Sequence, residues 1–145
     1  MGLDMYLYAK RYVSEYREED KPIKEKLAEA VGHDVSEVKS EAAYWRKANQ
    51  IHAWFVDNIQ DGEDDCKDYW VNRERLQELI DLCKQVKANP EKAEELLAPR
   101  GGFFFGSTEV DDFYLDDLDR TIEQLEAALA KYDNKWEFYY GSSWY

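Results

Sequence analysis

The chain has 145 residues, enough for one domain (1–145) with its own hydrophobic core and too few for two ordinary domains. Its 32 acidic and 19 basic residues give a net charge of −13, which argues against direct binding of nucleic acid or of an anionic membrane. With 44% hydrophobic and 15% aromatic residues, the composition is that of a folded binding protein and not of a disordered acidic chain.

Targeting and metal-binding signals are missing from the sequence. No segment approaches the roughly 18 consecutive apolar residues of a membrane helix, and the N-terminus lacks the basic start and apolar run of a signal peptide. Cys66 and Cys83 do not have the spacing of a metal site. We therefore expect a cytoplasmic protein with two free thiols and without a metal or cofactor. A homo-oligomer is possible.

Strand patterns lie at the two ends of the chain. Leu3, Met5 and Leu7 alternate with polar or tyrosine positions, and the alternation continues to Val13. A second alternation runs through residues 136–140, before Gly141. Because neither strand is stable alone, we predict that the two pair in one small antiparallel sheet, with residues 103–105 as a third strand.

Two helices are predicted in the first half of the chain. Asp20 precedes a helical pattern that ends at Gly32, and its inward positions are Ile23 and Leu27. Asp34 followed by Glu37 has the spacing of a capping box, which predicts a second, long helix that runs to about Gln60.

Helical patterns also fill the second half. Asn72 caps a helix whose apolar positions are Leu76, Leu79, Ile80, Cys83 and Val86. Asn89 and Pro90 end it, and a short turn follows through Leu97. The most regular amphipathic pattern is formed by Leu118, Ile122, Leu125, Leu129 and Tyr132. The predicted class is α+β: a small antiparallel sheet formed by the terminal strands, with three to five helices packed on it.

The segment 44–55 is the most unusual part of the sequence. On a helix, Asn49 and His52 would lie within the apolar face with Trp45, whereas Trp54 would lie opposite, beside Lys47. Polar groups in a buried stripe and a large aromatic side chain in a polar one indicate a binding site. Arg46 and Lys47 are either solvated side chains or the positive charges of a site for a small anion. Trp45 and Trp54 could stack on bases.

Three loops offer further candidates. Aligning Gly62 with the glycine of an EF-hand places acidic residues at four ligand positions, but Ile59 stands at another, so a solvated acidic turn is preferred. Arg100 with the glycines at 101, 102 and 106 either presents backbone N–H groups to an anion or turns the chain around the phenylalanines, Phe104 included. The third loop, at the C-terminus, contains Ser143.

His52 is the best general-base candidate, since an imidazole titrates near neutral pH. No nucleophile is found in a recognisable motif with it, and a lone histidine on an apolar face is more often a hydrogen-bonded core residue. We therefore assign no catalytic residue.

The chain resembles a group of small phage- and prophage-encoded proteins. The resemblance is carried by the start Gly2-Leu3-Asp4-Met5-Tyr6-Leu7 and by Tyr44-Trp45-Arg46-Lys47-Ala48-Asn49 with Ile51-His52 and Trp54-Phe55. It continues in Gln60-Asp61-Gly62 with Asp64-Asp65-Cys66, in residues 102–108, and in Phe138-Tyr139-Tyr140 with Ser142-Ser143-Trp144. The resemblance implies a protein of the bacterial host cytoplasm during infection, and implies that these five segments meet in space.

The leading hypothesis is a non-enzymatic, counter-defence protein that binds and sequesters a small nucleotide-like ligand. Its expected ligand-binding residues are Trp45, Arg46, Lys47, Asn49, His52, Trp54, Arg100, Phe104 and Ser143. One alternative is an acidic inhibitor that mimics nucleic acid and binds a basic host protein through residues 57–68 and 109–119. A second alternative is a nucleotide-acting enzyme that uses His52.

Overall fold

A computed structural model describes residues 2–102 and 105–144. These residues form a four-stranded antiparallel sheet of order β2-β1-β4-β3 and five α-helices, which confirms the α+β class. In chain order the elements are β1 (Leu3–Tyr12), α1 (Lys21–Val31), β2 (Glu37–Arg46), α2 (Asn49–Asn58), β3 (Tyr69–Val71), α3 (Arg73–Ala88), the 3₁₀ helix η1 (Pro90–Lys92), α4 (Ala93–Leu96), α5 (Asp112–Lys131) and β4 (Glu137–Trp144).

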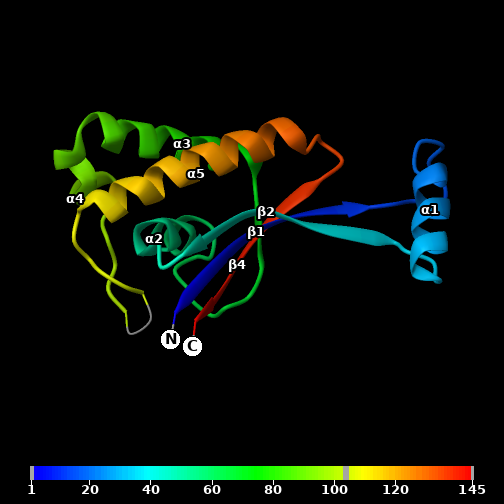
Figure 1. The fold of residues 1–145 in the computed structure, drawn as a ribbon, viewed down its shortest axis with the longest axis horizontal. Coiled ribbons are helices and arrows are strands. Elements are labelled where there is room, and N and C mark those ends of the chain that lie inside the picture. The colour runs from blue at the N-terminus through cyan, green and yellow to red at the C-terminus, as the bar shows by residue number, and fades with distance from the viewer. Residues whose placement is uncertain (1, 103–104, 145) are drawn as a thin grey trace.

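The terminal strands pair as the sequence predicts. β1 and β4 are antiparallel neighbours from Leu3 opposite Trp144 to Lys10 opposite Glu137, and they form the centre of the sheet. The chain ends therefore lie side by side (Figure 1). One face of the sheet is apolar and packs against the helices, and its fully buried residues include Leu3, Met5, Leu7, Phe138 and Tyr140.

The predicted long helix from Asp34 to Gln60 is wrong in its first half. Residues 37–46 form β2, and only Asn49–Asn58 are helical. In β2 the residues alternate between the two faces of the sheet, but a bulge at Ala42, between the partners of Leu7 and Tyr8, shifts the alternation. The capping-box spacing of Asp34 and Glu37 therefore does not mark a helix start. Of the predicted third strand at 103–105, residues 103 and 104 lie outside the described residues, and Phe105 lies in a bend.

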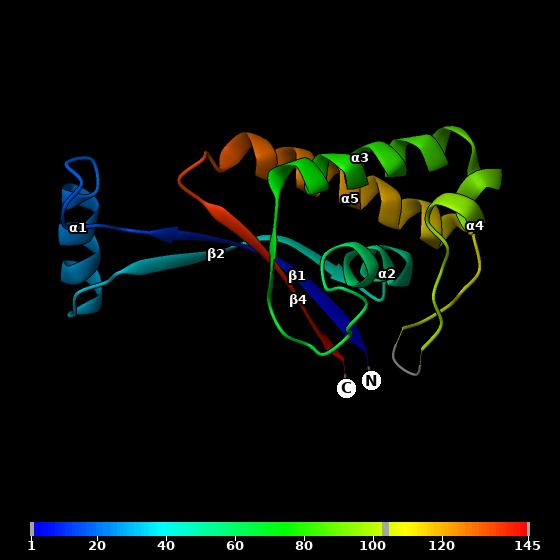
Figure 2. The ribbon, with the colours of Figure 1, turned by 180° about the vertical axis from the view of Figure 1, so that it is seen from behind.

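The later helices follow their predicted patterns. The Asn72 side chain accepts a hydrogen bond from the Glu74 N–H at the start of α3, and the five predicted apolar positions of that helix are buried. Asp111 caps α5 in the same way, through the Tyr114 N–H. α3 and α5 lie side by side above the sheet in both views (Figures 1 and 2). No helix among the described residues is long and apolar enough to cross a membrane.

α1 stands apart from the other helices. The ends of β1 and β2 extend beyond the sheet and carry α1 at their tip, far from the other helices (Figures 1 and 2). We call residues 11–38 the hairpin arm. The predicted inward residues Ile23 and Leu27 are only half-buried, and α1 has no buried residue. The Asp20 carboxylate does not cap the helix; it bonds Arg11 at 2.7 Å and the Ser14 N–H at 3.0 Å.

Candidate functional site

Asn49 organises the loop that follows α4. Its side-chain amide donates to the carbonyl oxygens of Phe105 (2.9 Å) and Ser107 (2.7 Å), and its oxygen accepts from the Arg100 N–H (3.0 Å). The side chain is 3% exposed, and its two donors and its oxygen are all engaged. Asn49 is therefore a structural residue that positions the loop beside α2, which explains its place in a buried stripe.

His52 is a second buried side chain that links separate segments by hydrogen bonds. Its Nδ1 lies 2.6 Å from the Tyr140 hydroxyl, and its Nε2 lies 2.9 Å from Asp64 Oδ2. Since a carboxylate only accepts, Nε2–H donates to Asp64 and Nδ1 accepts from Tyr140. Burial lowers the pKa of His52, and the hydrogen bond to Asp64 opposes that shift. With both ring nitrogens engaged and no exposed surface, His52 links α2, β4 and the loop after α2 as a core residue.

The two tryptophans expected to stack on a ligand are buried. The Trp45 indole N–H donates to the Thr121 hydroxyl of α5 at 2.8 Å, and its ring has no exposed surface. Trp54 is 7% exposed and packs edge-on against Phe55. The expected polar position of Trp54 is wrong because every residue of α2 from Asn49 to Val56 is buried, so this part of the helix has no solvent-exposed face.

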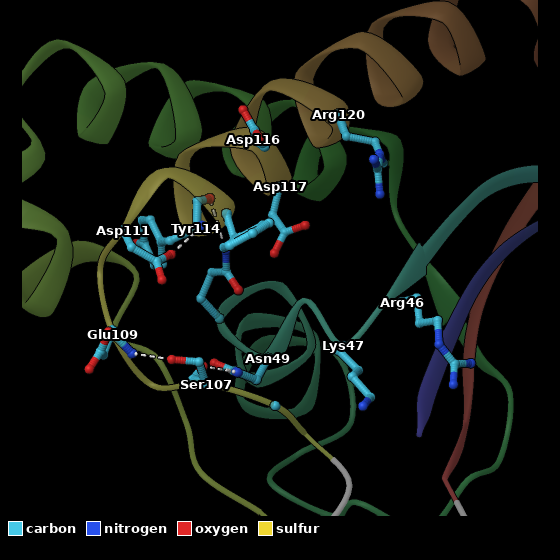
Figure 3. Close-up of a pocket in the computed structure, with 13 residues that line it drawn as sticks. Arg46, Lys47, Asn49, Ser107, Glu109, Asp111, Tyr114, Asp116, Asp117 and Arg120 are labelled. Carbon is cyan, nitrogen blue, oxygen red and sulfur yellow. Dashed lines mark hydrogen bonds between the residues drawn. The ribbon is translucent and has the colours of Figure 1, made fainter. Parts of the chain in front are cut away.

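A cavity of about 560 Å³ opens where β2 passes into α2 (Figure 3). Three segments line it: the end of β2 with the start of α2, the loop at 106–111, and the first three turns of α5. Its lining residues are Arg46, Lys47, Asn49, Gln50, Gly106, Ser107, Glu109, Asp111, Phe113, Tyr114, Asp116, Asp117 and Arg120.

Charges of opposite sign are separated within the cavity. Arg46, Lys47 and Arg120 lie on one side, Glu109 and Asp111 lie on the other, and Asp116 and Asp117 lie between them (Figure 3). Lys47 has a φ of 55°, a left-handed backbone conformation that is uncommon for a lysine and that turns the chain sharply from β2 into α2.

Asp117 is the most perturbed acid of the cavity. Burial raises its pKa to about 6, and hydrogen bonding to Gln50 and the charge of Arg120 oppose the rise. Gln50 is 3% exposed and donates to the Tyr114 carbonyl at 3.2 Å, so it ties the start of α2 to α5. A partly desolvated carboxyl with a raised pKa in a cavity marks a candidate binding residue.

The nine residues expected at one site are divided by the structure. Arg46, Lys47 and Asn49 line the cavity, whereas Trp45, His52 and Trp54 belong to the core. Arg100 points elsewhere and pairs with Asp57 at 2.5 Å. Ser143 lies on β4 opposite Asp4, and Phe104 lies outside the described residues.

Sequence reasoning missed the contribution of α5 to the cavity. Gln50, Asp117 and Arg120 carry no motif, but Phe113 gave a usable signal. It lies outside the apolar stripe of an otherwise regular helix, and its ring is 80% exposed. A large aromatic side chain on the polar face of a helix is a sign of a contact surface.

Several carboxylates of the acidic clusters at 57–68 and 109–119 are paired or hydrogen-bonded within the chain. Asp57 pairs with Arg100, Asp64 accepts from His52, and Lys87 pairs with Asp119. Asp111 caps α5. No group of three or more potential metal ligands is present in the described part of the chain.

Comparison of the chain with models of known protein families, with curated proteins and with solved structures gives no significant match. The geometry of the cavity is therefore the basis for proposing a function.

Proposed function

We propose that the protein binds a small nucleotide-like ligand in the cavity between α2 and α5, without converting it. The observation that carries the proposal is the separation of charge: three cations line one side of a space of about 560 Å³, and carboxylates line the other. That volume lies within the range of small-molecule sites, and a few polar groups that converge in one cavity are typical of such sites.

A nucleotide matches this arrangement in both of its parts. Lys47 and Arg120 present cations to a phosphate, whereas Arg46 behind them is paired with Asp4 at 2.8 Å. Asp117 and Asp111 present carboxyl oxygens that accept hydrogen bonds from the amino and imino N–H groups of a base. Phe113 adds an exposed ring, and stacking of a base on it contributes on the order of 1–3 kcal/mol.

Sequestration, and not catalysis, is favoured by the positions of the reactive groups. His52 is buried outside the cavity, and Cys83 is buried in α3. Among the described lining residues, the two hydroxyl groups are those of Ser107 and Tyr114. Tyr114 already donates to the Leu97 carbonyl at 2.6 Å, and Ser107 accepts from the Glu109 N–H at 3.1 Å.

The biological setting that we propose is counter-defence by a phage in the bacterial cytoplasm. It is supported by the resemblance to phage-encoded proteins, because capture of a small nucleotide without its destruction would silence a defence signal.

A panel of linear and cyclic nucleotides, screened by thermal shift and recovered after heat denaturation, tests the proposal. We expect at least one member to raise the melting temperature and to be recovered unchanged. Recovery of an altered nucleotide would mean an enzyme, and no shift with any member would contradict the proposal.

Variants then test the location of the site. Arg120→Gln combined with Lys47→Asn should weaken binding at least tenfold; asparagine is chosen because it tolerates the left-handed backbone at position 47. Lys26→Gln, which removes an exposed cation from α1, is the control and should bind as the parent protein does. Equal binding by the double variant would show that the cavity is not the site.

A further inference from the structure

The face of the sheet opposite the core carries a row of aromatic side chains that involves all four strands. Strand register places Trp70 beside Tyr139, Tyr139 beside Tyr8, and Tyr6 beside Tyr44. Tyr6 and Tyr8 lie two positions apart on β1 and therefore share this face. We call these five side chains the aromatic row. Trp70 is 53% exposed and the four tyrosines are half-buried, so the row lies at the surface and at a distance from the cavity residues of α5.

The rings of the row are ordered by one another and by cations. Tyr6 and Tyr8 are parallel within 7° with centroids 5.5 Å apart, and Tyr44 lies 5.2 Å from Tyr6. Lys39 Nζ lies 3.7 Å from the centre of the Tyr8 ring, and Lys10 Nζ lies 4.3 Å from that of Tyr139. These contacts show that the rings bind ammonium groups, and a cationic side chain of another molecule would compete with Lys39 and Lys10 for them.

Two carboxylates flank the middle of the row. Glu41 of β2 is directly opposite Tyr8, and Asp68 lies over Gly141 on the other side, so close that a Cβ at position 141 would stand 2.1 Å from Asp68 Oδ1. Both side chains are exposed, and neither forms an ion pair with another residue in the ranges that the structure describes. The pKa of Tyr8 is raised, first by burial and then by the charges of Asp68 and Glu41, which agrees with their closeness to the ring.

We propose that the aromatic row is a docking surface for a basic segment of a partner protein, whose arginine or lysine side chains contact Tyr8 between Asp68 and Glu41. Charge complementarity selects this occupant: two exposed, unpaired carboxylates stand beside cation-binding rings on a protein of net charge −13. Tyrosine and tryptophan are also the residues that dominate the binding energy of protein–protein interfaces.

Two other occupants fit the surface less well. The phosphates of a single-stranded nucleic acid would meet Asp68 and Glu41 on either side of Tyr8, and would meet the net charge of −13 as well. A second copy of the chain would bring the same carboxylates and the same net charge to the contact. The surface and the cavity meet at Arg46, which lines the cavity and pairs with Asp4, the acceptor of the Tyr44 hydroxyl. The proposed contact at Tyr8 involves no cavity residue, so this inference does not depend on the proposed ligand.

A fluorescein-labelled peptide of alternating arginine and glycine is the probe, with alternating glutamate and glycine as its counterpart. In anisotropy titrations at low salt, the arginine peptide should bind and the glutamate peptide should not. Asp68→Asn with Glu41→Gln should weaken binding at least tenfold. Asp61→Asn with Glu63→Gln is the control: it removes two negative charges from the exposed loop after α2 and should change the affinity less than twofold.

Tyr8→Ser tests the ring and should also weaken binding at least tenfold, with circular dichroism to confirm that the variant is folded. If it is not folded, the carboxylate pair decides the outcome alone, since both residues are exposed. If the carboxylate double variant and its control lose affinity for the arginine peptide equally, the binding is general attraction to an acidic protein, and the inference is overturned. Tighter binding of a dodecathymidine than of the arginine peptide, or a dimer that Tyr8→Ser dissociates, would overturn it as well.

Discussion

The carboxyl group of Asp117 is partly desolvated in the cavity, and this makes the stability of the protein depend on pH. A folded-state pKa of about 6, raised from 3.8, means that the charged form is disfavoured in the native protein. The contribution of this group to stability is therefore fully present below about pH 4 and is lost as the pH rises through 6. At neutral pH the native state holds a charged carboxylate at a cost.

Asp117→Asn should therefore stabilise the protein at pH 7.5. The full shift would convert to about 3 kcal/mol, but the carboxyl is only half-buried and solvent screening reduces the expected gain to about 1 kcal/mol. In urea titrations, the difference in free energy of unfolding between the variant and the parent protein should fall to zero as the pH is lowered from 6 to 4. Asp116→Asn, on an exposed neighbour, controls for the loss of one charge. A gain that is the same at pH 4 and pH 7.5 would refute the assignment.

At the scale of the elements, sequence patterns predicted the strands and helices that are regular along their length. β1 and α5 keep one period throughout, so alternation and a step of three or four residues were sufficient. The sequence did not predict the strand β2, because the bulge at Ala42 breaks its alternation. Its identity depends on pairing with β1 some 30 residues away in the chain, and on the Gln124 side-chain amide, which bonds the N–H and C=O of Tyr44 at 2.9 and 3.0 Å. Neither contact is visible in local sequence.

The candidate site was predictable only in part for the same reason. Arg46 and Lys47 were identified as possible positive charges of a site for a small anion, and they do line the cavity. Asn49 and His52 were identified because they would lie within an apolar helix face, but their polar groups form hydrogen bonds within the core. A buried polar side chain has one signature in the sequence whether it binds a ligand or holds two segments together. The difference is set by partners distant in the chain.

β4 is the element on which the sheet depends. It lies between β1 and β3 and buries Phe138 and Tyr140, and Tyr140 stacks on Phe55 with centroids 3.8 Å apart. Deletion of residues 136–145 should therefore abolish cooperative thermal unfolding. Phe138→Ala should cost about 3–5 kcal/mol, whereas Tyr139→Ala, on the other face of the same strand, should cost less than half of that. Full thermal stability of the truncated chain would show that the terminal strands do not close the fold.

At the scale of the whole molecule, the hairpin arm and the body are built differently. The body has a continuous core between the sheet and its helices, whereas α1 has no buried residue. The arm is held together by local contacts such as the Arg11–Asp20 pair at 2.7 Å. Between the arm and the body lies the exposed ion pair Lys135–Glu19 at 3.9 Å, and an exposed ion pair contributes little to stability.

The arm should therefore be dispensable for folding of the body. Replacement of residues 12–37 by Asn-Gly, which joins Arg11 to Val38 through a two-residue hairpin turn, removes α1 and leaves every strand pair of the body intact. Because no residue of the main core is lost, the melting temperature should change by no more than about 4 °C, the equivalent of roughly 1 kcal/mol for a chain of this size. Replacement of the β2 residues 40–45 by glycine and serine is the opposite case: it removes Ala43 and Trp45 from the core and should unfold the protein. A shortened arm that also abolishes cooperative unfolding would mean that α1 stabilises the body through the strands that carry it.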